Sequence, residues 1–291
     1  MNAGSDPNGW QPREVRKIHT IPRSSLALAL GAVFVLCVNF WGTAAPGGET
    51  VTFKSADSTM NAPIPAAVYR PQGNGPFPGV VLLHDCSGLH PYQADWAAWL
   101  QGTGYVAILP DSLSPRNLTT TCGSSGGFTM RDHALDGLGA LAYLRSRSDV
   151  SPTKVAVMGW SFGGGATLIS ASARFINGNH PDGGGYQAAI ALYPVCAVFQ
   201  EGDLAAPLLM LMGSADDWQP PARCVERGTA LQAAGAAVEW TTYPGAMHAF
   251  DQPGQARVVH ISGHTYHLQY DAAAAADAHT QVQRFLSAHL Q

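Results

Sequence analysis

Short, uninterrupted runs of apolar residues recur along the chain and constrain its fold more than any other feature. Runs of this length without polar alternation are typical of strands buried on both faces of a sheet. They lie at Pro78–His84, Tyr105–Leu109, Lys154–Met158, Ala188–Leu192 and Leu208–Met212. Stretches with helical spacing separate several of them, at Tyr92–Gln101, Arg131–Arg145 and Ala222–Ala233. This alternation predicts an α/β fold, in which a mostly parallel sheet carries helices on both faces.

The remaining segments extend the same pattern. We expect two short strands at a sheet edge, a further strand, two helices and two long loops. In chain order these are Val51–Lys54, Ala66–Tyr69, Phe162–Ala173, the loop Asp182–Gly185, Val238–Tyr243, the loop Gly254–His267 and Ala272–His289. No internal repeat or change of composition follows residue 50, so residues 46–291 are expected to form one domain.

The N-terminal residues 1–45 resemble a secretory signal. Four basic residues and two acidic ones precede the uncharged apolar run Leu26–Val38, and small residues follow at Gly42–Ala45. A basic start, a short apolar segment and a small-residue exit are the three parts of a signal peptide. The alternative is an uncleaved membrane anchor, because the uncharged stretch is almost long enough to span a bilayer. Either reading predicts a protein that functions outside the cytoplasm, in the periplasm or secreted.

Four cysteines remain after this segment, and an even number in an exported chain is compatible with two disulfides. Neighbouring loops at one sheet edge favour the pairs Cys86–Cys122 and Cys196–Cys224. Four buried free thiols are the alternative. The net charge is −4, and no cluster of Lys and Arg suggests a surface for nucleic acid. We expect a monomer.

Two stretches match the pattern Gly-x-Ser-x-Gly, namely Gly123–Gly127 and Gly159–Gly163. A nucleophile elbow requires a strand before the serine and a helix after it. Only the second match meets this requirement, since KVAVM precedes it and GGGATLISA follows it. Ser161 is therefore the candidate nucleophile, and Ser125 is the weaker alternative.

A serine nucleophile needs a histidine base and a carboxylate that orients the base. Asp216 follows the predicted strand Leu208–Met212, and His248 follows the predicted strand Val238–Tyr243. The carboxyl ends of parallel strands meet at one edge of a sheet, so these side chains can converge on Ser161. Asp217 is a weaker alternative to Asp216. The backbone N–H groups of Phe162 and Cys86 are the candidate oxyanion hole.

Other side chains near these loops are candidates for the substrate pocket. They are Asp85, Trp160, Trp218 and Arg131, with Arg116 as a second arginine beside the Gly-rich loop 118–130. Core packing is an equal alternative for the tryptophans, and a solvated side chain is the alternative for each arginine. The spacing of His260, His264 and His267 matches no closed zinc pattern, so we expect no metal and no cofactor.

Taken together, the motifs GWSFGGG, GSADDW, YPGAMHAFD and LLHDCSGLH resemble those of the dienelactone hydrolase family of α/β hydrolases. The resemblance covers about residues 50–290. It implies the α/β-hydrolase fold, hydrolysis of carboxylic esters or lactones, and Ser161, Asp216 and His248 as the catalytic triad. The founding members of the family use a cysteine nucleophile where this chain has Ser161, and a glutamate where it has Asp85. Dienelactone itself is therefore a doubtful substrate, and Asp85 is expected to organise its loop instead.

Two further hypotheses compete with this one. The stretch VMGWSFGGGATLIS also resembles bacterial cutinases and polyester hydrolases. A binding module built on a hydrolase scaffold is the non-enzymatic alternative. It is disfavoured because all three triad residue types are present in order.

Overall fold

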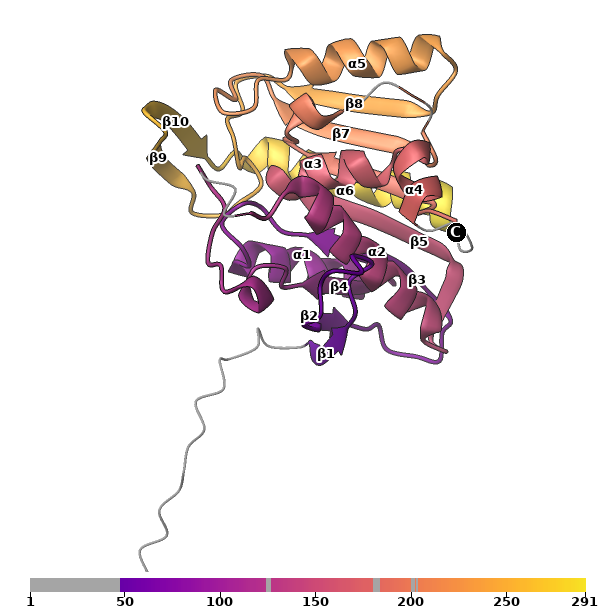
Figure 1. Ribbon diagram of the computed structural model, residues 1–291. Helices are drawn as coiled ribbons and strands as arrows, with labels where there is room; N and C mark the ends of the chain where they lie inside the picture. The colour runs from indigo at the N-terminus through magenta and orange to yellow at the C-terminus, as the bar shows by residue number, and fades with distance from the viewer. Residues whose placement is uncertain (1–47, 124–126, 180–183, 200–201, 203) are drawn as a thin grey trace, which may run out of the picture. The chain divides into compact units, whose positions relative to one another are not determined.

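The computed structural model describes residues 48–123, 127–179, 184–199, 202 and 204–291 (Figure 1). These residues belong to one compact unit. The predicted signal peptide, residues 1–45, lies outside the described residues, as do Ser125 and half of the expected loop Asp182–Gly185. Within the described part of the chain, no helix is long and apolar enough to cross a membrane.

A mixed sheet forms the centre of the described unit. Its strands are β1 (Glu49–Phe53), β2 (Ile64–Tyr69), β3 (Phe77–Leu83), β4 (Val106–Pro110), β5 (Val150–Trp160), β6 (Ala188–Leu192), β7 (Leu208–Gly213) and β8 (Val238–Tyr243). They lie in the order β1-β2-β4-β3-β5-β6-β7-β8. Only the β1–β2 and β2–β4 pairs are antiparallel; the other neighbours are parallel. The predicted parallel sheet and its short edge strands are thus confirmed.

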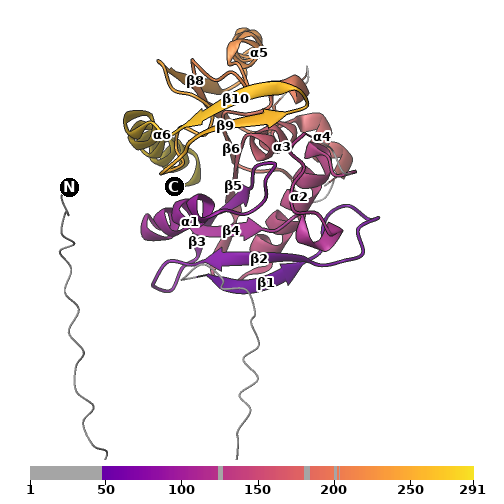
Figure 2. The same ribbon diagram turned by 90° about the vertical axis from the view of Figure 1, so that its left-hand side faces the viewer.

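Helices cover both faces of this sheet, as predicted. One face carries α1 (Pro91–Gly102) and α6 (Ala272–Leu290), and the other carries α2 (Met130–Ser146), α3 (Phe162–Ser170) and α5 (Ala222–Ala233). Figure 2 shows α1 and α6 on one side of the strands and α2 and α3 on the other. The buried strand residues alternate between two apolar clusters, one for each face. This alternation explains why the strands are apolar on both sides.

Two elements differ from the predictions. The helix expected over Phe162–Ala173 ends at Ser170, and a separate helix, α4 (Ala173–Asn179), follows it. The prediction of a loop at Gly254–His267 is wrong, because most of this segment forms an antiparallel hairpin of β9 (Ala256–Ile261) and β10 (His264–Gln269). The hairpin pairs outside the main sheet (Figure 1), so it lacks the apolar runs that identify the central strands. Ser262 and Gly263 form its turn with positive φ of 50° and 79°.

Candidate active site

Ser161 occupies the sharp turn between the end of β5 and the start of α3. Its φ of 52° and ψ of −109° are strained for a residue with a side chain. The turn is possible because glycines flank it: a Cβ on Gly159 would overlap the carbonyl oxygen of Gly163, and one on Gly163 would overlap that of Leu83. The strand, the strained serine and the glycine-bordered helix together form the geometry of a nucleophile elbow.

The structure brings His248 and Asp216 to this turn. His248 Nε2 lies 3.1 Å from Ser161 Oγ, and His248 Nδ1 lies 2.7 Å from Asp216 Oδ2. The three residues come from the loops after β5, β7 and β8, at the carboxyl ends of parallel strands. All three are buried, with 3–6% of their surface exposed. A neutral imidazole that donates from Nδ1 to the carboxylate presents Nε2 to accept the hydroxyl proton of Ser161.

The carboxylate of Asp216 is fixed by its own loop. Its Oδ1 accepts hydrogen bonds from the backbone N–H groups of Trp218 at 2.9 Å and Gln219 at 2.7 Å, which leaves Oδ2 for His248. The alternative acid, Asp217, points elsewhere. Its two oxygens accept from the backbone N–H of His267 and pair with the Nδ1 of the same residue at 2.6 Å. Asp217 therefore joins its loop to β10 and does not contact His248.

The two candidate oxyanion donors lie on opposite sides of Ser161 in the sequence. Phe162 is the first residue of α3, where backbone N–H groups have no acceptor within the helix. Cys86 lines the same cavity as Ser161, and its carbonyl oxygen accepts the backbone N–H of Thr121 at 2.7 Å. That hydrogen bond turns the carbonyl of Cys86 toward Thr121 and fixes the orientation of the residue in its loop.

Two disulfides join the pairs that the sequence favoured. Cys86 is bonded to Cys122, and both residues line the cavity at Ser161. Cys196 is bonded to Cys224, which links the turn after β6 to helix α5. The Cα atoms are 5.0 Å and 5.3 Å apart in the two pairs. The first disulfide therefore closes the wall of the candidate active site, and the second lies in the apolar core.

The model of the dienelactone hydrolase family matches residues 64–290, which is most of the chain. The chain belongs to the dienelactone hydrolase family. This match covers all the residues of the site described above, from Asp85 to His248.

Individual relatives agree with this assignment. A protein of Yersinia pestis, provisionally named a carboxymethylenebutenolidase, is 28% identical over 70% of this chain and 78% of its own length. A provisionally named dienelactone hydrolase from Klebsiella pneumoniae has a TM-score of 0.62 at 21% identity, over 82% of this chain and 99% of its own. Thermogutta terrifontis esterase 2, phosphorylated by paraoxon, has a TM-score of 0.61 at 19% identity, over 81% and 92% of the two chains. These structural matches identify the α/β-hydrolase fold.

A cavity of about 410 Å³ opens above Ser161 in this dienelactone hydrolase family member. Trp218 forms part of its wall, as predicted, with its ring centre 5.0 Å from that of His248. The β9–β10 hairpin supplies another part of the wall, which the sequence analysis missed. Its contributions are Arg257, Val259, His260, Ile261 and Leu268. The sequence does contain a pattern that could have predicted this hairpin. Ser262-Gly263 lies between two stretches with valine, isoleucine and tyrosine, which is typical of a hairpin turn between two strands.

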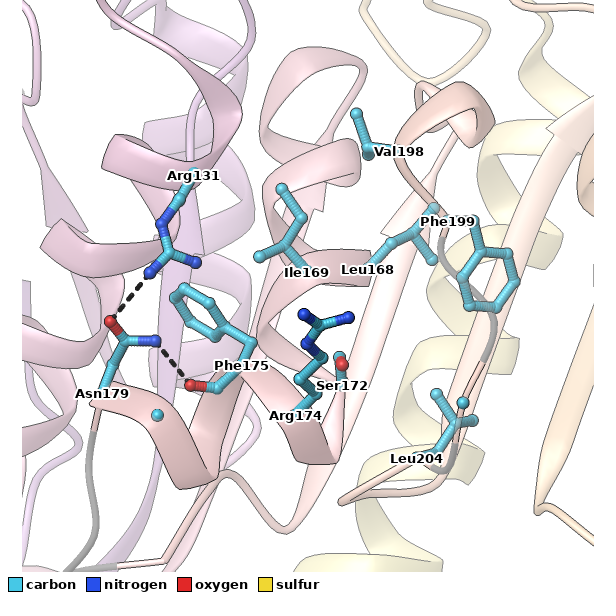
Figure 3. Close-up of a pocket in the computed structure, with 12 residues that line it drawn as sticks. Arg131, Leu168, Ile169, Ser172, Arg174, Phe175, Asn179, Val198, Phe199 and Leu204 are labelled. Atoms are coloured by element: carbon cyan, nitrogen blue, oxygen red, sulfur yellow. Dashed lines mark hydrogen bonds between the residues drawn. The ribbon is translucent and has the colours of Figure 1, made fainter.

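Two predicted pocket residues do not reach this cavity. Trp160 is fully buried in the core beneath Ser161, so its assignment to the pocket is wrong. Arg131 is also absent from the cavity wall. It lies in a separate cavity of about 460 Å³ beside α4, where it donates to Asn179 at 3.1 Å and packs over the ring of Phe175 (Figure 3). The position of a residue along the chain does not determine which way its side chain points, so the sequence could not predict these two placements.

The other arginine beside the Gly-rich loop is neither solvated nor free to bind a substrate. Arg116 donates to both oxygens of the buried Asp136, at 2.8 Å and 3.0 Å. Asp85 lies at the edge of the cavity and accepts hydrogen bonds from the backbone and hydroxyl of Ser87 and from the hydroxyl of Tyr92 at 2.7 Å. The carboxylate of Asp85 therefore organises the loop that carries Cys86.

Metal ligands do not gather in the described part of the chain. No group of three or more His, Cys, Asp and Glu side chains there is placed to hold a metal ion. His267 is paired with Asp217, and His260 Nδ1 lies 3.0 Å from the hydroxyl of Thr265 within the hairpin.

Proposed function

We propose that this protein is a serine hydrolase that cleaves carboxylic esters or lactones through an acyl-enzyme intermediate. The observation that carries the proposal is the continuous series of contacts from Asp216 through His248 to Ser161, at 2.7 Å and 3.1 Å. This order of groups activates a hydroxyl for attack on an acyl carbon. The ester and lactone substrate class is supported by the family to which the chain belongs.

The steps follow from the positions of these residues. His248 accepts the proton of Ser161 as Oγ attacks the carbonyl carbon, and the resulting oxyanion lies toward the N–H groups of Phe162 and Cys86. His248 then donates this proton to the leaving alcohol. In a lactone, the leaving oxygen stays attached to the acyl group. Water attacks the acyl carbon as His248 accepts its proton. His248 then returns this proton to Ser161 Oγ as the acyl-enzyme bond breaks, which releases the acid and free Ser161.

We also propose that the protein works outside the cytoplasm, with residues 1–45 as a signal peptide or an anchor. Two disulfides support this location, because disulfides persist in oxidising compartments. Mass spectrometry of the protein in the exported fraction tests the cleavage: a new N-terminus near Ala44 or Ala45 supports a signal peptide, and an intact N-terminus supports an anchor.

Ser161→Ala tests the catalytic proposal with p-nitrophenyl acetate and p-nitrophenyl butyrate as substrates. We expect kcat to fall by several orders of magnitude while the circular dichroism spectrum is unchanged. Paraoxon should label the wild-type protein once, at Ser161, and should not label the variant. If Ser161→Ala retains ordinary esterase activity, the assignment of the nucleophile is wrong.

A further inference from the structure

A second carboxylate, Asp251, is buried behind the triad and has no part in the mechanism above. It lies three residues after His248 in the same loop, and only 4% of its surface is exposed. Its Oδ2 accepts hydrogen bonds from the indole N–H groups of Trp96 and Trp160, both at 2.9 Å, and its Oδ1 accepts the hydroxyl of Tyr193 at 2.7 Å. No cation in the described residues forms an ion pair with it.

The hydrogen-bond donors around this carboxyl favour its ionised form, although burial raises its pKa overall. An indole N–H can only donate, and the Tyr193 hydroxyl already accepts a hydrogen bond from Gln252 Nε2 at 3.1 Å, so its own proton is free for Asp251. Burial raises the pKa of Asp251, and the three hydrogen bonds oppose that rise. Burying a carboxylate that is held only by neutral donors lowers the stability of the fold, so we expect the residue to have a specific function.

The partners of Asp251 are next to the reacting groups. Trp160 is the last residue of β5 and precedes the strained Ser161. The ring of Tyr193 lies against that of His248, edge to face, with centres 4.7 Å apart. Tyr193 itself has a positive φ of 35°, which requires support from its surroundings. One carboxylate thus contacts the residue before the nucleophile and the residue that packs on the base.

We propose that Asp251 is a positioning residue, which holds Ser161 and His248 in register through its hydrogen bonds to Trp160 and Tyr193. It ties the His248 loop to the ends of β5 and β6 and to α1. The inference rests on the proposed function, since it assigns Asp251 a role in the same reaction. Small displacements of reacting groups lower the rate more than they lower substrate affinity, because they act on the transition-state geometry.

Asp251→Asn is the central test, because it keeps the shape of the side chain and replaces one acceptor oxygen by an NH₂ group. The NH₂ group cannot accept a hydrogen bond from the Tyr193 hydroxyl or from the two indole N–H groups. With p-nitrophenyl butyrate we expect kcat to fall by about 10- to 100-fold and KM to change by less than about threefold. In ¹⁵N–¹H spectra the indole N–H resonances of Trp96 and Trp160, assigned with Trp96→Phe and Trp160→Phe, should shift.

Asp136→Asn is the matched control. Asp136 is also a fully buried carboxylate, but both of its oxygens accept from Arg116 and neither accepts from a triad residue. We expect it to lower the melting temperature at least as much as Asp251→Asn and to leave kcat within about twofold. An equal loss of kcat in this control, or a rise in KM with constant kcat in Asp251→Asn, would overturn the proposal.

Tyr193→Phe provides a second route to the same answer, since it removes one donor and keeps the ring against His248. The loss of kcat caused by Asp251→Asn should be smaller in the Tyr193→Phe background than in the wild type, because the two residues act through one hydrogen bond. Additive losses would contradict the inference.

If Asp251→Asn does not fold, Tyr193→Phe and Trp160→Phe must each lower kcat at constant KM; unchanged kcat in both overturns the proposal. Failure of the proposed function is distinct, because it appears in the wild type as absent ester hydrolysis.

Discussion

At the scale of single residues, the candidate triad depends on which of two adjacent aspartates faces His248. Sequence order favoured Asp216 but left Asp217 open, because a one-residue shift in a loop reverses the direction of a side chain. The structure separates them: Asp216 contacts His248 at 2.7 Å, and Asp217 pairs with the exposed His267 on β10. The two residues can therefore be distinguished by parallel substitutions.

Asp216→Asn is expected to lower kcat by about three to four orders of magnitude, since the amide cannot hold the Nδ1–H tautomer that leaves Nε2 free to accept a proton. Asp217→Asn should change kcat by only a few-fold, because an exposed pair contributes little. Steady-state kinetics on both variants at one pH provide the measurement. Equal losses in the two variants would mean that the acid has been wrongly assigned.

Other residue-scale features could not be predicted from the sequence. Trp160 and Trp218 both flank a triad residue in the sequence, yet one is in the core and the other lines the cavity. Arg131 lies in the first turn of α2 beside a Gly-rich loop, but its side chain turns toward Asn179. Asp251 ends the motif YPGAMHAFD, but its position in the sequence indicates no role for it. Each of these depends on side-chain direction, which periodicity does not determine in loops and at element ends.

At the scale of elements, the sequence predicts the strands of the central sheet and the helices that cover it. The β6 and β8 strands and helix α5 have the predicted bounds, because apolar runs and helical spacing reflect the sheet and its covering layer. The β9–β10 hairpin was missed because most of its residues are exposed on both faces, as its burial pattern shows. A strand that buries little carries little period-two signal. The loop carrying Cys86 was placed correctly because it follows a central strand.

This loop leads to a prediction that contrasts the two disulfides. Replacing Cys86 and Cys122 together by serine should lower kcat by about 10- to 100-fold, because the loop that presents the Cys86 N–H is no longer bonded covalently to the segment that carries Cys122. Replacing Cys196 and Cys224 together should leave kcat nearly unchanged, since neither residue lines the cavity. Each pair should also lose roughly 2–4 kcal/mol of stability, given loops of 36 and 28 residues.

The measurement is kcat, together with urea unfolding, for both double variants under oxidising conditions. A similar fall in kcat for the two variants would show that the disulfides act on activity only through overall stability. Unchanged kcat in the Cys86→Ser/Cys122→Ser variant would remove the support for Cys86 as an oxyanion donor held by its disulfide.

At the scale of the whole molecule, two buried histidines should make stability depend on pH. His84 and His133 are fully buried with ring centres 4.3 Å apart, and burial lowers the pKa of both. Neither nitrogen of His133 has a hydrogen-bond partner in the described part of the chain. Both imidazoles therefore stay neutral in the folded protein at pH values where the unfolded chain binds protons, below about 6.5.

The sign of the effect follows from proton linkage. Because the unfolded state binds more protons, the free energy of unfolding falls as the pH drops below about 6.5, by up to about 1.4 kcal/mol per pH unit for each such histidine. His133→Phe replaces the imidazole by an apolar ring among Phe128, Phe162 and His84. The unfolded variant then has one fewer histidine that can bind a proton. We expect a shallower decline for this variant between pH 7.5 and pH 5, measured by urea unfolding at each pH. His264→Gln, at an exposed position of β10, should follow the wild-type curve. A wild-type slope in His133→Phe would show that His133 remains protonated in the folded protein or that His84 alone controls the dependence.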